Sequence, residues 1–432
     1  MPASYPPHNA WIISFAGLCC LFAGLRSAPM ARGAFWLGLV YGALSLGLTV
    51  SWLFRIFPAQ VPFALFVLFG LFHAAFAGIF FRCAPRLRFP SLFAAALWTS
   101  IEFYRSEWFA LHYPWITPGI ALGPTFLSPL VGVYGATFLV VLAAAMATQH
   151  GTRVAGAALA AILLAMTMLR PAVVEPHLPL RVAAIQAEEA MISTYCDMTL
   201  SATNAPQLVV WPEESYASDI RKDAPRDFQK LVALASNLSC VLTFGTQTRT
   251  GAGPRDWWNT ALTIDRSGAL GEHYKNRPVP LFNDGRPSDR AAPVTTPAGV
   301  AATPICYDCD SPEITRRMTA AGAQFFAVPS MDAERWSAKQ HIQHAALVRL
   351  RAAECGRWFV VGSSSGISQI VDPNGCVRGI LPVMSPGVLC GTIGIENRIT
   401  PYVRFGWLLP RVLIIASLAG IVIASFKKLE KL

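Results

Sequence analysis

Charged residues are scarce in this chain of 432 residues: only 14% are Asp, Glu, Lys or Arg, whereas 53% are hydrophobic. A purely soluble protein of this length carries more charge, so part of the chain is expected to lie in lipid. The formal net charge is +10. The Lys and Arg residues nevertheless form no continuous stripe suited to a phosphate backbone, so no nucleic-acid partner is expected.

A dense and regular spacing of cysteines is also absent. The ten cysteines are scattered along the chain, which excludes a small disulfide scaffold. Low-complexity tracts and internal repeats are missing as well. The N-terminal stretch MPASYPPHNAWIISFAGLCC lacks a basic n-region and an A-x-A cleavage site. Its apolar segment is therefore expected to be retained as a span rather than removed as a signal peptide.

Long apolar runs are what the sequence does contain. A helix needs about 20 apolar residues to cross a bilayer, and the candidate segments are 10–26, 33–57, 61–81, 89–104, 124–148, 153–170 and 408–426. Alternate connections between them carry the basic residues, namely RSAPMAR, RCAPRLR, HGTR and the tail FKKLEKL. The positive-inside rule then places these connections in the cytoplasm and the region between Arg170 and the last span outside it.

The region 171–400 has a different sequence pattern. Short β-rich runs (LRVAAIQA, QLVVWPE, CVLTFGT, ALTID, VAATPICYD, QFFAVPS and WFVVGSSSG) alternate with two helical patterns, RDFQKLVALASNL and SAKQHIQHAALVRLRAAECG. This alternation predicts a layered α/β domain. We therefore expect three parts: a transmembrane domain of about six spans over 1–170, an α/β domain over 171–400, and a C-terminal transmembrane helix with a basic tail over 401–432.

Three expected strand ends carry reactive side chains: Glu213 in LVVWPEES, Lys275 in GEHYKNRPVP and Cys306 in TPICYDCD. A thiol with its ordinary pKa near 8.5 is mostly protonated at neutral pH, so it needs a base or a nearby cation to act as a nucleophile. Glu213 could accept the thiol proton. Lys275 and the backbone amide of Tyr307 could stabilise the oxyanion of a tetrahedral intermediate.

These residues and their surroundings resemble the nitrilase, or carbon-nitrogen hydrolase, superfamily. The match rests on WPE, on a Lys after a strand and a Tyr, on ICYD, and on the downstream stretch VPSMDAERWSAKQHIQHAALVRLRAAECGRWFVVGSSSGISQIVDPNG. The resemblance implies an α-β-β-α sandwich with a catalytic triad of Glu213, Lys275 and Cys306. It calls for no metal ion and no organic cofactor.

The membrane half narrows the resemblance. The segments GLVYGALSLGLTVSWLF, LWTSIEFYRSEWFALHYPWITPGIALG and LSPLVGVYGATFLVVLAAAMA are similar to spans of the apolipoprotein N-acyltransferase family. This resemblance implies a multi-pass protein of a bacterial-type inner membrane with its catalytic domain on the periplasmic side. It further implies acyl transfer from a phospholipid, through a Cys306 thioester, to an amine such as the N-terminus of an apolipoprotein.

The sequence departs from this family at several places. Asn283 stands where a second glutamate is expected, with Asp284 beside it, and the family's Cys-Tyr-Glu reads Cys306, Tyr307, Asp308. The stretch between Lys275 and Cys306 is short, and one N-terminal span is missing. A relative linked to plasmid conjugation with a different acceptor, a membrane-anchored amidase and a catalytically idle scaffold therefore stay open as alternatives.

Residues outside the triad have narrower expected roles. Tyr307, Asp308, Asn283 and Asp284 are candidates for the oxyanion site or for supporting the triad, and the aromatic candidates for the substrate pocket are Trp211, Tyr274 and Trp336. Those three aromatic residues could equally be plain core.

Several of these residues and motifs also have alternative interpretations. Cys306 could be a buried structural thiol or could pair with Cys309 as C-x-x-C, although the sequence has no second C-x-x-C for zinc. GSSSG could make Ser364 a nucleophile, but a strand rather than a helix is expected after it. His341 and His344 lack an evident third metal ligand. Glu214 is expected on the opposite face from Glu213.

Overall fold

The computed structural model describes residues 5, 10–169, 172–251, 253 and 256–429. The chain forms two compact units: Met1–Arg170 with Phe405–Leu432, and Pro171–Arg404. The end of the expected basic tail, residues 430–432, lies outside the described part.

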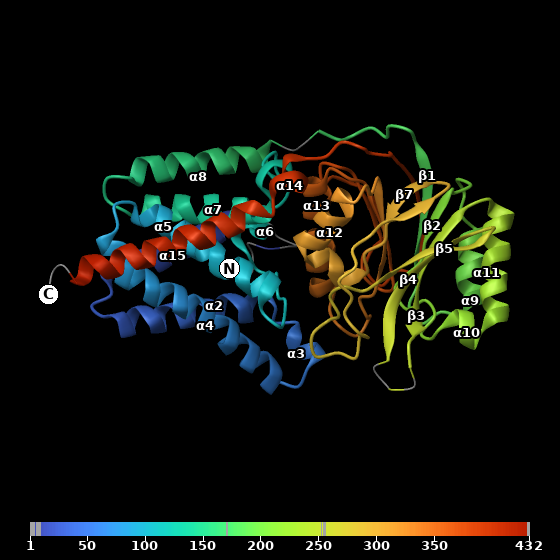
Figure 1. The fold of residues 1–432 in the computed structure, drawn as a ribbon, viewed down its shortest axis with the longest axis horizontal. Coiled ribbons are helices and arrows are strands. Elements are labelled where there is room, and N and C mark those ends of the chain that lie inside the picture. The colour runs from blue at the N-terminus through green and yellow to red at the C-terminus, as the bar shows by residue number, and fades with distance from the viewer. Residues whose placement is uncertain (1–4, 6–9, 170–171, 252, 254–255, 430–432) are drawn as a thin grey trace. The chain divides into compact units, whose positions relative to one another are not determined.

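The first unit is helical (Figure 1). A helix lies at each of the seven apolar segments, as the following bounds show: α1 (Trp11–Ser27), α2 (Ala31–Thr49), α3 (Leu53–Ile56), α4 (Gln60–Cys83), η2 (Ala84–Arg86), α5 (Pro90–Phe103), η3 (Tyr104–Trp108, a π-helical turn), α6 (Pro118–Leu122), α7 (Ser128–Ala147), α8 (Arg153–Met168) and α15 (Leu408–Leu429).

Four stretches in the described residues are long and apolar enough to cross a membrane: Ala31–Thr49, Gln60–Arg86, Ser128–Ala147 and Leu408–Lys427. The apolar helices α1 and α8 are shorter, at 17 and 16 residues. The presence of several membrane-length helices agrees with the expected membrane domain. The number of helices that actually span, expected to be about six before residue 170, stays a prediction.

The second unit contains two six-stranded sheets, ordered β12-β1-β2-β3-β4-β5 and β11-β10-β9-β8-β7-β6. The strands are β1 (Leu180–Gln186), β2 (Leu208–Val210), β3 (Val241–Arg249), β4 (Trp257–Asp265), β5 (Gly268–Tyr274), β6 (Val294–Thr296), β7 (Gly299–Ala302), β8 (Phe325–Ser330), β9 (Phe359–Ser363), β10 (Gln369–Val371), β11 (Val377–Ile380) and β12 (Gly387–Ile393). The helical elements are α9 (Ile192–Leu200), α10 (Ile220–Asp223), α11 (Pro225–Leu238), η4 (Cys306–Asp310, a 3-10 turn), α12 (Pro312–Ala320), α13 (Ala338–Cys355) and α14 (Pro401–Phe405).

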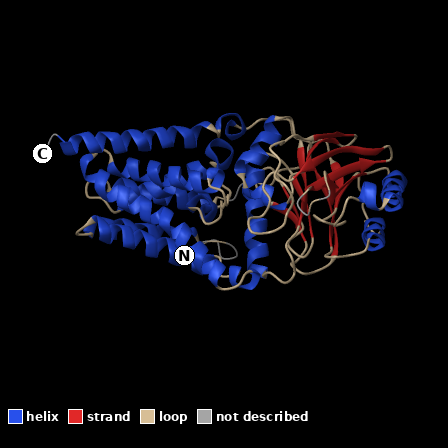
Figure 2. Ribbon diagram, turned by 60° about the horizontal axis from the view of Figure 1, so that its bottom comes forward, coloured by secondary structure: helices blue, strands red, loops and turns tan. Residues whose placement is uncertain are grey.

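The sheets stack face to face between two layers of helices (Figure 2). Side chains alternate along a strand, so β1 sends Val182 and Ala184 into the core between the sheets, and Ala183 and Ile185 into the core with α9 and α11. On the other sheet, Phe326 and its neighbours pack against α12 and α13. The predicted α-β-β-α sandwich is therefore confirmed.

This packing gathers the segments that follow several strands. The backbone N–H of Glu213, three residues beyond β2, donates to the carbonyl of Ser330 at the end of β8 (3.3 Å). The N–H of Lys275, directly after β5, donates to the carbonyl of Asn259 in β4 (2.9 Å). The turn η4, which begins with Cys306, follows β7. Residues far apart in the sequence thus meet where these strands end.

Candidate active site

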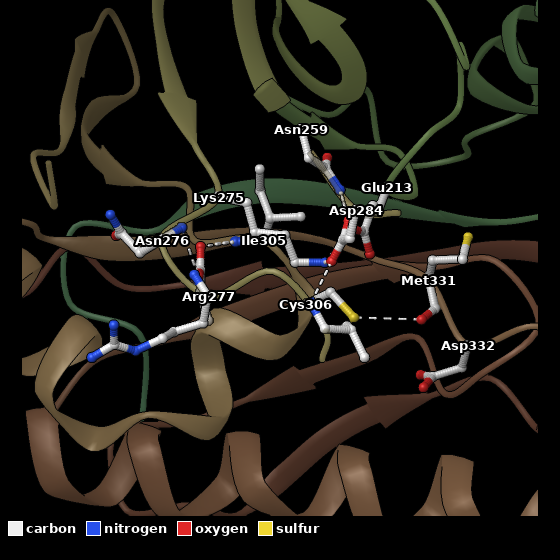
Figure 3. Close-up of polar contacts among 12 residues, drawn as sticks. Glu213, Asn259, Lys275, Asn276, Arg277, Asp284, Ile305, Cys306, Met331 and Asp332 are labelled. Carbon is white, nitrogen blue, oxygen red and sulfur yellow. Dashed lines mark hydrogen bonds and ion pairs between the residues drawn. The ribbon is translucent and has the colours of Figure 1, made fainter. Parts of the chain in front are cut away.

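A lysine held between two acids forms the centre of the site (Figure 3). Lys275 Nζ lies 2.6 Å from Glu213 Oε1 and 2.7 Å from Asp284 Oδ2. Asn259 Nδ2 donates to both carboxylates, at 2.7 Å each. The side chains of Lys275 and Glu213 are only 1% and 3% exposed. Such a desolvated cluster fixes the lysine far more firmly than a surface ion pair would.

Burial controls the ionisation of this cluster. Burial raises the pKa of Glu213 to about 7, although the Lys275 ammonium opposes this shift. Burial alone would lower the pKa of Lys275, but Asp284 and Glu213 raise it well above its usual range. Lys275 is therefore a fixed cation. Glu213 is balanced near neutral pH, which suits a group that accepts and returns a proton.

Cys306 opens the turn η4 in a left-handed conformation, with φ of 48°. This conformation is uncommon for residues other than glycine, and it recurs at functional sites. The Sγ atom donates to the carbonyl of Met331 (3.4 Å; Figure 3). Burial, and then the Glu213 carboxylate, raise the pKa of the thiol well above its usual range. The resting thiol is therefore protonated and needs a base before it can attack.

Asp308 ties the turn η4, which begins with Cys306, to the segment that follows Lys275. Its Oδ1 atom accepts from the backbone N–H groups of Asn276 (2.9 Å) and Arg277 (2.7 Å). Its Oδ2 atom accepts from the N–H of Ile305 (3.1 Å) and lies 3.0 Å from His273 Nε2. A fully buried carboxylate with four partners holds both backbones in one geometry.

The predicted polar residues divide into two groups. The first group makes the contacts described above and comprises Glu213, Lys275, Cys306, Asp284 and Asp308. The second contains Asn283, which is exposed to solvent. Asp284 thus occupies the place beside the lysine where the family pattern predicts the second acid. Tyr307 is half-buried, and the oxyanion role of its amide stays a prediction.

The aromatic candidates lie in different surroundings. The Trp211 indole is fully buried, stacks on Tyr195 (5.0 Å between ring centroids) and belongs to the core beneath α9 and α11, a structural role rather than a pocket role. Tyr274 stacks on Trp258 at 4.4 Å. Trp336 is 8% exposed and contacts Phe282 at 5.8 Å; lining of a pocket by Tyr274 or Trp336 stays a prediction.

Sequence reasoning missed Asn259 and His273. Asn259 lies in strand β4, whose sequence WWNTALTID also contains threonines and an aspartate, and it is fully buried. An amide inside a β-rich run was the available signal. His273 is two residues before Lys275 and pairs with a residue 35 positions away, which no local pattern encodes. Within the described residues, no group of three or more His, Cys, Asp or Glu side chains is placed to hold a metal ion.

The fold and this site define a class of enzyme. Residues 164–398, more than half of the chain, match the family described as Carbon-nitrogen hydrolase, and the chain belongs to this family. Residues 1–146 match the Apolipoprotein N-acyltransferase N-terminal domain. The resemblance inferred from the sequence is confirmed on both halves.

Individual relatives cover nearly the whole chain. Apolipoprotein N-acyltransferase of Pseudomonas paraeruginosa is 28% identical and covers 98% of this chain and 92% of its own length. That of Azotobacter vinelandii is also 28% identical, over 94% and 89%. A carbon-nitrogen hydrolase structure from Helicobacter pylori is 19% identical over 54% of this chain and 95% of its own, with a TM-score of 0.45.

Proposed function

We propose that this protein is a membrane N-acyltransferase that moves a fatty acyl chain from a phospholipid, through a thioester on Cys306, to the N-terminal amine of an apolipoprotein. The observation that carries the proposal is the buried set of Glu213, Lys275 and Asp284 beside Cys306. Two further facts support it: the membrane-length helices of the same chain and the near full-length likeness to apolipoprotein N-acyltransferases.

The first half-reaction makes the thioester. Glu213 takes the proton from the Cys306 thiol, and the thiolate attacks the carbonyl carbon of a phospholipid ester. The Lys275 ammonium and the Tyr307 amide stabilise the resulting oxyanion. When the ester C–O bond breaks, the lysophospholipid alkoxide takes the proton from Glu213 and leaves as an alcohol.

The second half-reaction consumes the thioester. The acceptor amine attacks the carbonyl carbon, and Glu213 takes a proton from the nitrogen. The C–S bond breaks, the amide forms, and the Cys306 thiolate recovers a proton from Glu213. Water must be kept from the thioester because hydrolysis would waste the acyl group. A lipid donor can reach the site by lateral diffusion if the catalytic unit lies on the periplasmic side of the inner membrane, as we further propose.

The test is the intact mass of detergent-purified protein after incubation with phospholipid and no acceptor. We expect a hydroxylamine-labile fatty-acyl adduct on the wild type and none on Cys306→Ala. Lys275→Met should form the adduct on the order of 10²- to 10³-fold more slowly because an oxyanion donor is lost, while its thermal melt still shows a folded protein. A folded wild type that gains no acyl mass in the presence of lipid would refute the proposal.

A further inference from the structure

A second buried ionic cluster lies directly behind the nucleophile. Asp332 follows Met331, whose carbonyl accepts the Cys306 S–H. The Asp332 carboxylate is 2.9 and 3.1 Å from Nδ1 of His344 and accepts from Gln340 Nε2 at 2.8 Å. Both Gln340 and His344 lie on α13. The loop after β8 is thus anchored to this helix through Asp332.

His344 also reaches the nucleophile turn. Its other ring nitrogen, Nε2, lies 3.4 Å from Oδ1 of Asp310, the last residue of the turn that Cys306 begins. The side chains of His344, Asp332 and Asp310 are 6%, 4% and 1% exposed. One imidazole therefore bridges the turn that carries the thiol and the loop that accepts its hydrogen bond.

The two acids fix the charge of this ring. Burial alone would lower the pKa of His344, but Asp332 and Asp310 raise it to about 9. Burial favours protonation of Asp332, yet His344 holds the pKa of that carboxyl below its usual value. The Glu213 carboxylate, in the segment after β2, adds to the raised pKa of His344, and His341 of the same helix adds to the lowered pKa of Asp332. At neutral pH His344 is therefore an imidazolium held between the side chains of Asp332 and Asp310.

The GSSSG motif supports the same loop. Ser364 Oγ accepts from the backbone N–H of Asp332 (3.0 Å). A Cβ at Gly366 would lie 2.3 Å from Asp332 Oδ2, so only glycine leaves room for the carboxylate. These contacts give Ser364 a role in holding the loop, and β10 follows as a strand rather than the helix that a serine nucleophile elbow requires.

We propose that His344 is a positioning residue for Cys306: its imidazolium links η4 to the loop after β8 and neutralises the two buried carboxylates that flank the nucleophile turn. Asp332 opposes ionisation of the Cys306 thiol. Without the His344 cation, the charge of this carboxylate would be less compensated and the thiolate would be costlier to form. The inference rests on the proposed function only in taking Cys306 as the nucleophile.

The test measures the reactivity of the Cys306 thiol in the absence of lipid. Alkylation of Cys306 by iodoacetamide is followed against pH by peptide mass in the full-length protein, with Cys306→Ala as the blank. His344→Gln should move the midpoint of the pH–rate profile up by about one unit, which is about a tenfold slower reaction below the midpoint. His341→Gln is the matched control, because this buried ring on the same helix contacts the Ala333 carbonyl at 3.1 Å, whereas His344 is the ring that bridges Asp332 and Asp310; its profile should match the wild type.

A second variant guards against misfolding. Asp310→Asn keeps the contact between His344 and Asp332 and removes one acid from the turn that Cys306 begins, so its midpoint should move down. Opposite shifts for His344→Gln and Asp310→Asn support the inference, and if His344→Gln does not fold, the downward shift of Asp310→Asn alone decides. Equal profiles, shifts in the same direction, or a shift in His341→Gln as large as in His344→Gln would overturn it. Opposite shifts in a wild type that forms no acyl adduct would keep this inference and refute the proposed function.

Discussion

At the scale of single residues, the question is which of the neighbours Asn283 and Asp284 supplies the second acid beside Lys275. The family resemblance places a glutamate at 283, yet Asn283 is exposed, and Asp284 contacts Lys275 instead. Asp284 also accepts from the backbone N–H of Val279 (2.7 Å), which fixes the loop that carries it. The second acid is therefore present one position later in the sequence.

This arrangement predicts different effects for two adjacent residues. Asp284→Asn removes the ion pair that orients Lys275. Misplacement of a catalytic group typically lowers the rate on the order of 10²-fold. Asn283→Ala should stay within about twofold of the wild type because it removes no contact with the lysine. The measurement is the rate of acyl-adduct formation at one phospholipid concentration, with thermal melts as the folding control. An equal loss in both variants would contradict this assignment.

Glu213, Lys275 and Cys306 could be grouped as a candidate triad because each was expected at the end of a β-rich run. The structure brings Glu213 and Lys275 into contact, and the catalytic roles stay predictions. The sequence also indicates Asp284 and Asp308 as supporting candidates, but the partners of Asp308 and the contact between Asp332 and His344 could not be predicted. Asp308 and His273 are 35 positions apart, and Asp332 lies 12 residues from His344. Such contacts depend on how helices and strands pack against one another. Hydrophobic periodicity and secondary-structure propensity do not encode this packing.

At the scale of elements, β3 runs against the segment that carries Glu213. A Cβ at Gly245 would lie 2.2 Å from the backbone N of Glu214 and 2.5 Å from Cα of Glu213. Both obstacles are backbone atoms, so no side-chain rotation can relieve the clash. Glycine at this position is therefore what lets the strand pass the catalytic segment closely.

Gly245→Ala should accordingly lower the free energy of unfolding by about 1–3 kcal/mol, the usual cost of overpacking a core. Gly387→Ala is the matched control, because it also lies in a strand and the atom nearest its added Cβ would be 3.5 Å away, an ordinary contact. Denaturant unfolding of the two variants against the wild type measures the difference. Equal stability of Gly245→Ala and Gly387→Ala would show that the strand shifts freely.

The elements themselves were only partly predictable. Every apolar β-rich run contains a strand, and β5 was expected only as the strand end before Lys275. The strands β6, β11 and β12 were missed because they are short or are interrupted by glycines and polar residues. The run VAATPICYD was expected to be β-rich throughout, yet β7 ends at Ala302 and a 3-10 turn begins at Cys306. Pro304 lies between them and cannot donate to a sheet ladder.

At the scale of the whole molecule, the helical unit places its basic connections together. Arg26, in the last turn of α1, donates to the Ala145 carbonyl near the end of α7 (2.8 Å). Lys427 donates to the carbonyl of Arg86 (3.1 Å). Ser91, just after that connection, donates to Gln149 in the loop between α7 and α8 (2.6 Å). Connections that are distant in sequence thus meet at one end of this unit.

That clustering supports the predicted orientation, because basic connections are retained in the cytoplasm. A fluorescent protein fused after residue 151 or at the C-terminus should therefore fluoresce, and alkaline phosphatase fused after residue 290 should be active, since that enzyme needs an oxidising compartment for its disulfides. The exchanged fusions, phosphatase after 151 and fluorescent protein after 290, are the matched controls and should be silent. A silent phosphatase together with a bright fluorescent protein at residue 290 would place the catalytic unit in the cytoplasm and reverse the proposed access to periplasmic lipoproteins.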